Sequence, residues 1–173
     1  MSLTGKNNEE KIWNFLTGKG LNSYGAAGLM GNLFAESGLN PHNLQNTYEK
    51  KLGYTDNSYT EAVDSGKYTG YTHDSAGYGL AQWTYWSRKE ALLNYVKAAG
   101  ASIGDLETQL GFLWKELGEN YAAVLATLKK ATSVRQASDA VLFKYEQPKD
   151  QSASVQTKRA SYGQPYCANY ATT

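Results

Sequence analysis

The amino-acid sequence predicts a mainly helical protein with a tyrosine-rich insert. Apolar residues recur at helical spacing on both sides of residues 40–85, and that central segment lacks such a period. The segment instead mixes tyrosines with Gly, Asn, Asp, Ser and Thr, a composition typical of turns and short elements. The chain of 173 residues is long enough to bury one core without disulfides. We therefore expect a single domain over residues 1–173.

Two helices are predicted before the insert. Asn7 followed by Glu10 resembles a capping box, and Gly18 and Gly20 end this first helix. The second helix is expected from Ser23 to Ser37, because apolar residues repeat there every three to four positions. Three glycines form a smooth ridge that permits close approach of another helix, at a propensity cost of about 1 kcal/mol each: Gly25, Gly28 and Gly31.

The insert is expected to consist of turns, short strands such as a hairpin, and a short helix around residues 61–63. Its Gly77-Tyr78-Gly79 stretch indicates a tight approach of the backbone to another group. The stretch does not read as a phosphate loop, since no Lys-Ser/Thr pair follows it.

Helical periodicity returns after the insert. Ser102 with Asp105, and Ser133 with Gln136, resemble further capping boxes, and Pro148 ends the helix that Ser133 begins. The expected helices cover residues 87–99, 106–117, 121–128, 133–145 and 153–162.

Composition excludes several classes of function. A net charge of +1 argues against non-specific binding to nucleic acid, and no apolar run is long enough to cross a membrane. The first five residues do not have the layout of a signal peptide. Neither His42 nor His73 has a partner at metal-ligand spacing, and Cys167 lies near the chain end, where a bystander role is the simpler interpretation. We expect no cofactor and a monomer.

Two segments could carry chemistry. Glu36 closes the second helix, where the helix dipole and neighbouring aromatic residues would raise the pKa of its carboxyl group, as a general acid requires. By position alone, a solvated surface glutamate is the more ordinary interpretation. Residues 74–84 combine small residues with Gln82 and Trp83, which suits a neutral ligand that bears hydroxyl and amide groups, such as an amino sugar. A glycine turn that leads into a helix explains the same residues equally well.

The segments GLMGNLFAESGLNP (residues 28–41) and DSAGYGLAQWTYWSR (residues 74–88) resemble the phage tail lysozyme family of the lysozyme-like superfamily. The segments LETQLGFLWKEL and YEQPKDQSASVQTKRASYGQ resemble it too, so the likeness covers about residues 7–166 in the correct order. The resemblance implies a lysozyme-like fold with the insert as one cleft wall. It also implies cleavage of the β-1,4 bond between N-acetylmuramic acid and N-acetylglucosamine in peptidoglycan.

The resemblance assigns residues one by one. Glu36 matches the catalytic glutamate that protonates the glycosidic oxygen, and Ser37 matches the residue that follows it. Gly79-Leu80-Ala81-Gln82 resembles the Gly-Leu-Met-Gln segment that lines the sugar cleft in goose-type lysozymes and lytic transglycosylases, with Ala81 in place of Met. The implied substrate-binding set is Ser37, Tyr78, Gly79, Gln82, Trp83 and Tyr145.

The second catalytic group is left open. Glycosidases usually use two carboxylates, and Asp74 is the best candidate for one that orients water, ahead of Asp64, Glu49 and Glu146. With a single acid, water attack gives hydrolysis, whereas assistance by the substrate's N-acetyl group gives an anhydro sugar. We expect hydrolysis.

Three rival functions are kept. The chain could be a lytic transglycosylase, a cell-wall-binding module without catalysis, or a peptidase that uses Cys167. Its substrate places it outside the cell, at the cell wall or on a phage tail, and the chain is compatible with a domain cut from a larger cell-wall hydrolase or tail protein.

Overall fold

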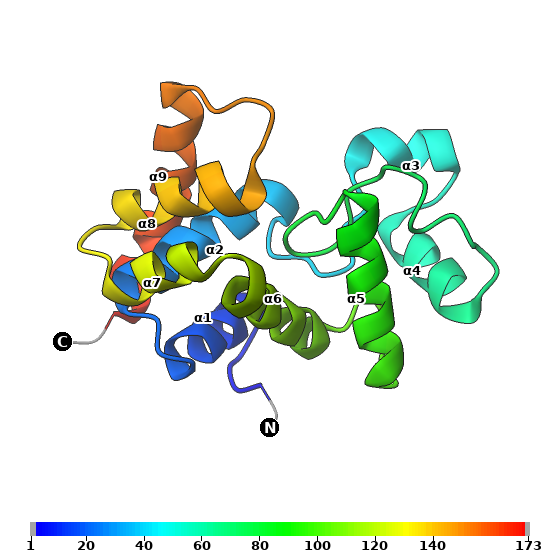
Figure 1. Cartoon of the computed structure of the whole chain (residues 1–173), viewed down its shortest axis with the longest axis horizontal. Helices are drawn as coiled ribbons and strands as arrows, with labels where there is room; N and C mark the ends of the chain where they lie inside the picture. Colours follow the sequence, from blue (N-terminus) through cyan, green and yellow to red (C-terminus); the bar gives the residue numbers. More distant parts are fainter. Residues whose placement is uncertain (1–2, 172–173) are drawn as a thin grey trace. The chain divides into compact units, whose positions relative to one another are not determined.

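A computed structural model describes residues 3–171, and within them the protein is mainly helical and has no strand (Figure 1). Contacts group the chain into two compact units. The split unit contains the residues up to 35 and those from 114 onwards, and the insert unit contains residues 36–113. The predicted boundaries at residues 1 and 173 lie outside the described residues, and the single-domain organisation stays a prediction.

The first helices begin and end as predicted. In α1 (Asn8–Gly18), the Asn7 side chain accepts a hydrogen bond from the Glu10 amide at 2.9 Å, which satisfies a first-turn donor. Helix α2 (Ser23–Ser37) has the predicted bounds, and its last two residues already belong to the insert unit.

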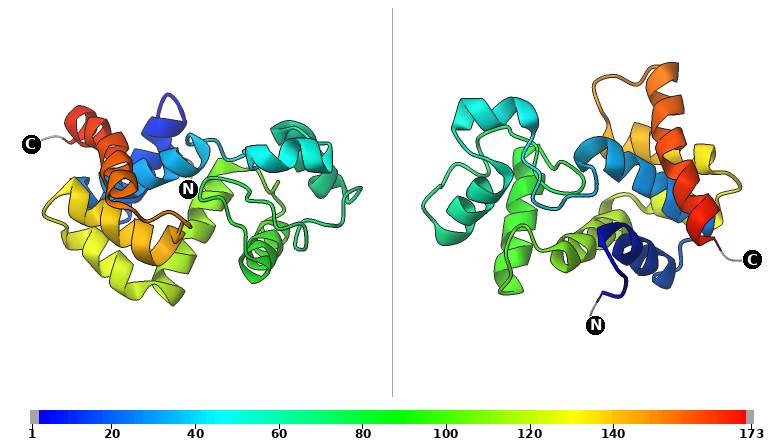
Figure 2. Two further views of the ribbon diagram at one scale, coloured as in Figure 1. Left: turned by 90° about the horizontal axis from the view of Figure 1, so that it is seen from above. Right: turned by 180° about the vertical axis from the view of Figure 1, so that it is seen from behind.

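The glycine ridge of α2 is a close-packing surface in the split unit. A Cβ atom added to Gly25 would lie 1.8 Å from the carbonyl oxygen of Leu128 in α7 (Ala122–Lys130). At Gly28 it would meet α8 (Val134–Ala140), and at Gly31 it would lie 2.5 Å from the Arg159 carbonyl oxygen in α9 (Ala153–Tyr170). Figure 2 shows α9 crossing α2 at close range. One helix face therefore receives the backbones of three others.

The C-terminal helices depart from prediction in two respects. The helix after Ser133 changes at Val141–Glu146 into a π-helical turn, η1. Helix α9 runs past its predicted end at residue 162 and includes Pro165. The extension is stabilised by tertiary contacts, since Tyr166 is buried and the ring of Tyr170 packs 5.6 Å from that of Trp13. These contacts outweigh the backbone hydrogen bond that a proline removes.

The insert unit contains helices where short strands were expected. Helices α3 (Asn46–Leu52) and α4 (Asp56–Ser65) lie next to each other, and α5 (Trp86–Ala98) stands beside the long loop that follows them (Figures 1 and 2). The short helix predicted at residues 61–63 is part of α4, which Thr55 caps through Ser58. In place of the expected hairpin, the described residues contain two isolated antiparallel bridges, which pair Tyr78 with Leu44 and with Trp83.

Helix α6 (Leu106–Asn120) begins with a cap that differs from the predicted one. The side chain of Asp105 accepts from the Thr108 amide at 3.0 Å and is the capping group. Ser102 instead donates to Asp64, and the Ile103 amide donates to the same carboxylate at 3.0 Å. None of the helices in the described part of the chain is long and apolar enough to cross a bilayer.

We predict that Gly31→Ala destabilises the protein by about 2–3 kcal/mol, because the new methyl group collides with backbone atoms of Arg159 and Gly163 that cannot move cheaply. Gly118→Ala in α6 is the matched control. A methyl group there meets nothing within 4 Å, so helix propensity should add up to about 1 kcal/mol of stability. Urea denaturation of both variants measures the difference. Equal stability of the two variants would contradict the ridge packing.

Candidate active site

The end of α2 presents Glu36 on a short reversal of the chain. Glu36 is half-buried at the penultimate position of the helix. The next three residues turn the backbone sharply, since Gly38 and Leu39 both have φ near +64°. The amide of Asn40 closes the turn by donating to the carbonyl oxygen of Ser37 at 3.2 Å. The turn therefore fixes where the helix ends relative to Glu36.

A buried hydrogen bond joins the two segments that the sequence singled out. The hydroxyl of Ser37, 7% exposed, donates to the carbonyl oxygen of Leu80 at 2.8 Å. These residues are 43 positions apart in the chain. The residue that follows Glu36 is thus in contact with the Gly-Leu-Ala-Gln turn, as a common site requires.

Gln109 of α6 holds this turn in place through hydrogen bonds, a role that the sequence analysis did not predict. Its Oε1 atom accepts from the amide of Leu80 at 3.0 Å, and its Nε2 atom donates to the carbonyl oxygens of Pro41 and Ile103 at 2.7 and 2.6 Å. Gln109 is fully buried, so each of these bonds replaces water that its partner has lost. The sequence feature that could have identified Gln109 is its position, since it is an amide residue among the apolar positions of α6.

Gly79 is required by this arrangement for two reasons. Its φ of +85° is left-handed, and an added Cβ atom would lie 2.9 Å from Oε1 of Gln109. Its amide donates to the carbonyl oxygen of Asn43 at 2.9 Å. The predicted close approach of the backbone at this glycine is therefore present.

Gln82 shapes the turn with its side-chain amide. Its Nε2 atom donates to both the backbone oxygen and the side-chain oxygen of Asn43, at 2.9 and 3.1 Å, and to the carbonyl oxygen of Gly79 at 3.1 Å. Gln82 itself has a φ of +53° and is half-buried. The donors of its amide are engaged within the loop, and its contact with substrate stays a prediction.

Tyr78 and Trp83 lie beneath the loop. Both side chains are 0% exposed. The hydroxyl group of Tyr78 lies 2.5 Å from that of Thr60, and the ring of Trp83 packs edge-on against Phe112 at 5.4 Å. The structure gives both side chains a packing role, and their predicted part in substrate binding is untested.

Asp74 is the centre of a buried polar cluster. Its carboxylate accepts from the hydroxyls of Tyr59 and Tyr68 at 2.6 and 2.9 Å and from the Ala76 amide at 3.0 Å. It also forms an ion pair with Lys89 at 2.8 Å, and the side chains of the pair are 3% and 0% exposed. A carboxylate with this many partners holds the insert unit together. Its role as a group that orients water stays a prediction.

Lys89 completes the cluster from α5. Its Nζ atom donates to Asp74 and, at 2.8 Å, to the carbonyl oxygen of Ala76, and it lies 4.2 Å from the ring centroid of Tyr71. Burial lowers the pKa of Lys89, an effect that Asp74 opposes. Burial also raises the pKa of Tyr59 and Tyr71 well above 10. The ion pair survives burial because its polar atoms are satisfied.

Two further candidates, Tyr145 and Cys167, lie in the split unit. Tyr145 belongs to the split unit, is 1% exposed, and donates to Oε1 of Glu116 at 2.7 Å. Its ring packs edge-on against Tyr121 at 5.0 Å. Cys167 is a half-buried free thiol in α9. Within residues 3–171, no cluster of three His, Cys, Asp or Glu side chains could hold a metal ion.

A sequence model of the phage tail lysozyme family matches residues 7–170, nearly the whole chain. No curated protein matches the chain. The match implies a lysozyme-like enzyme that degrades peptidoglycan, acting at the cell wall or from a phage tail. The mainly helical fold agrees with it.

We predict that Tyr71→Phe leaves stability unchanged or raises it by about 1 kcal/mol. Among the described residues, its buried hydroxyl has no hydrogen-bond partner, whereas its ring can still pack under Lys89. Tyr59→Phe is the matched comparison. It removes a donor from Asp74 and should cost about 2 kcal/mol. Urea denaturation at neutral pH distinguishes them, and a larger loss in Tyr71→Phe would refute this account.

Stability should also fall as pH rises above about 10. Unfolded tyrosines release their protons near pH 10, whereas burial keeps the protons of Tyr59 and Tyr71 bound in the folded state. Each such group removes about 1.4 kcal/mol per pH unit above pH 10 and nothing below it. The lowered pKa of Lys89 makes stability rise with pH, but only up to the pKa of an unfolded lysine near 10.5, so it does not oppose the fall at higher pH. Denaturation at pH 8 and 11 tests this, and Tyr71→Phe should reduce the slope.

Proposed function

The chain belongs to the phage tail lysozyme family, and from this premise we propose that it cleaves the β-1,4 bond between N-acetylmuramic acid and N-acetylglucosamine. Glu36 acts as the general acid. The observation that carries the proposal is the hydrogen bond from Ser37 to Leu80, which puts the end of α2 against the Gly-Leu-Ala-Gln turn. A glycan strand that lies along this turn meets backbone groups and an adjacent carboxyl group.

The role of each residue follows from its contacts. Glu36 is half-buried, so its carboxyl can meet substrate while most of the surrounding turn stays packed. In its neutral form it protonates the glycosidic oxygen as the bond breaks. Ser37, Gly79 and Gln82 hold the turn in position through bonds within the insert unit. Tyr78 and Trp83 support the same wall from inside.

The second step of the reaction has two candidate routes. In hydrolysis, a water molecule attacks the anomeric carbon, and we propose this as the outcome. The engagement of both Asp74 oxygens by four donors supports the alternative, in which the substrate's own N-acetyl group attacks. That route gives an anhydro sugar, as in a lytic transglycosylase, and needs only one protein carboxyl group.

We predict that Glu36→Gln lowers the rate of glycan cleavage at least about 100-fold, because the amide has the same shape but cannot donate an acidic proton. Release of reducing ends and loss of turbidity of purified cell walls measure the rate. The matched control is Glu61→Gln, which changes an exposed glutamate of α4 and should leave the rate unchanged. Thermal unfolding should be the same in all three proteins.

Near-normal cleavage by Glu36→Gln would overturn the assignment. Binding to cell walls by both proteins, without cleavage by either the wild type or the variant, would support a binding module instead. Mass analysis of the products separates the two routes, since transglycosylation products are lighter by one water than hydrolysis products.

A further inference from the structure

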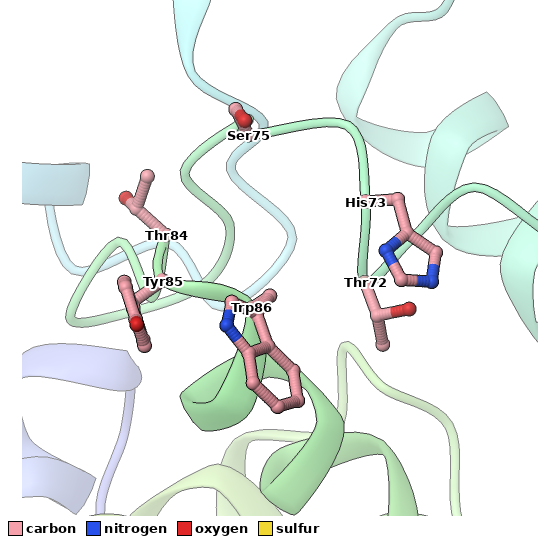
Figure 3. Close-up of a pocket in the computed structure, with 6 residues that line it drawn as sticks. All are labelled: Thr72, His73, Ser75, Thr84, Tyr85 and Trp86. Carbon is pink, nitrogen blue, oxygen red and sulfur yellow. The ribbon is translucent and has the colours of Figure 1, made fainter.

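A surface pocket lies beside the loop that carries Gln82, and the site described above does not use it (Figure 3). Its volume is about 550 Å³, which is within the range of small-molecule sites. Two stretches of the insert unit form it, one before Gly77 and one after Trp83. They contribute Thr72, His73 and Ser75 on one side and Thr84, Tyr85 and Trp86 on the other.

The pocket combines exposed aromatic rings with neutral polar groups. Tyr85 is 64% exposed and Trp86 is 51% exposed, although side chains of this size bury much of their surface in most proteins. Their ring centroids are 6.1 Å apart, with an angle of 36° between the ring planes. The other four lining residues bring hydroxyl groups and one imidazole, and none of the six is an acid, a lysine or an arginine.

The buried cluster connects the two stretches that form the walls of the pocket. Asp74 lies between two lining residues, His73 and Ser75, and pairs with Lys89 at 2.8 Å. Lys89 lies one helical turn after Trp86, the first residue of α5, and Tyr85 precedes that helix, so this ion pair connects one wall to the other. A link between the two walls limits their relative movement, which lowers the entropy cost of binding a ligand.

The pocket also adjoins the candidate active site. The Thr84 hydroxyl donates to the carbonyl oxygen of Gln82 at 2.8 Å. A ligand in the pocket therefore lies next to the turn that contains Gln82, and a polymer could occupy both places at once.

We propose that this pocket is a second saccharide-binding site, which takes an N-acetylated sugar of the same glycan strand. The inference rests on the proposed function. A pyranose ring has an apolar face that can stack on Trp86 or Tyr85, and its edge carries hydroxyl and acetamide groups that suit Thr72, Ser75 and Thr84. A lining without cations or carboxylates fits the neutral sugar backbone better than charged stem peptides or phosphate polymers.

The test uses the N-acetylglucosamine tetramer as the probe, titrated into the Glu36→Gln protein. The chain has two histidines, and the NMR signals of the His73 imidazole report on the pocket directly. His42, which contacts Asn57 at 3.0 Å, serves as an internal reference. We expect a saturable shift of the His73 signals that exceeds any shift of the His42 signals.

Two variants in the same background identify the binding surface. Trp86→Ala and Tyr85→Ala should each weaken the affinity reported by His73 about tenfold, which corresponds to about 1.4 kcal/mol. Both side chains are exposed, so thermal unfolding should not change. Tyr24→Ala is the matched control, since Tyr24 is an aromatic residue that is 43% exposed in the split unit. Its affinity should equal that of the parent.

The proposal is overturned if the His73 signals do not shift, or if both variants bind as tightly as the parent. It is also overturned if the parent protein dimerises in sedimentation experiments, Trp86→Ala abolishes the dimer, and sugar affinity stays unchanged. Failure of the catalytic assignment is seen separately. A wrong catalytic assignment would appear as cleavage of cell walls by Glu36→Gln. The titration measures sugar binding in the pocket whether or not that protein cleaves the glycan.

Discussion

The candidate site depends on the contact between the end of α2 and the glycine turn. Ser37 supplies the hydrogen bond, and Gln109 fixes the same turn through Leu80. Both residues are buried, so a failure of either would leave a backbone group without a partner and without water. These side chain–backbone bonds add to the backbone pairing of the same loop, in which Tyr78 forms antiparallel bridges with Leu44 and Trp83.

The insert unit is organised by a buried charge pair where a small sheet was expected. Asp74 and Lys89 would be costly to bury alone, but tyrosine hydroxyls and backbone groups satisfy them. The tyrosines also pack on one another, with ring centroids of Tyr59 and Tyr78 5.4 Å apart. Each tyrosine thus supplies apolar area to the core and a polar tip to the cluster.

Local signals predicted the helices well, because caps and periodic apolar residues act within a few positions. Asn7 and Ser133 cap their helices as expected, and α2 has its predicted bounds. The insert could not be predicted in this way. Lys89 and Gln109 are polar residues at buried helix positions, and their partners are far away in the sequence. The same holds for Asp74, whose surroundings became clear only with the fold. The family resemblance implied that the end of α2 and the Gly-Leu-Ala-Gln turn line one cleft, and no local signal predicted the hydrogen bond from Ser37 to Leu80.

The division of the chain bears on how the protein emerges from the ribosome. The insert unit is one continuous stretch, so all of its residues are available once position 113 has left the exit tunnel. The split unit needs its N-terminal helices and the last third of the chain together. During translation, α1 and the greater part of α2 therefore keep their apolar faces exposed until the C-terminal helices have been made, whereas the insert unit can already fold. A nascent chain halted when position 113 has just left the exit tunnel would hold a folded insert unit, while its N-terminal helices still lack the C-terminal helices that complete the split unit.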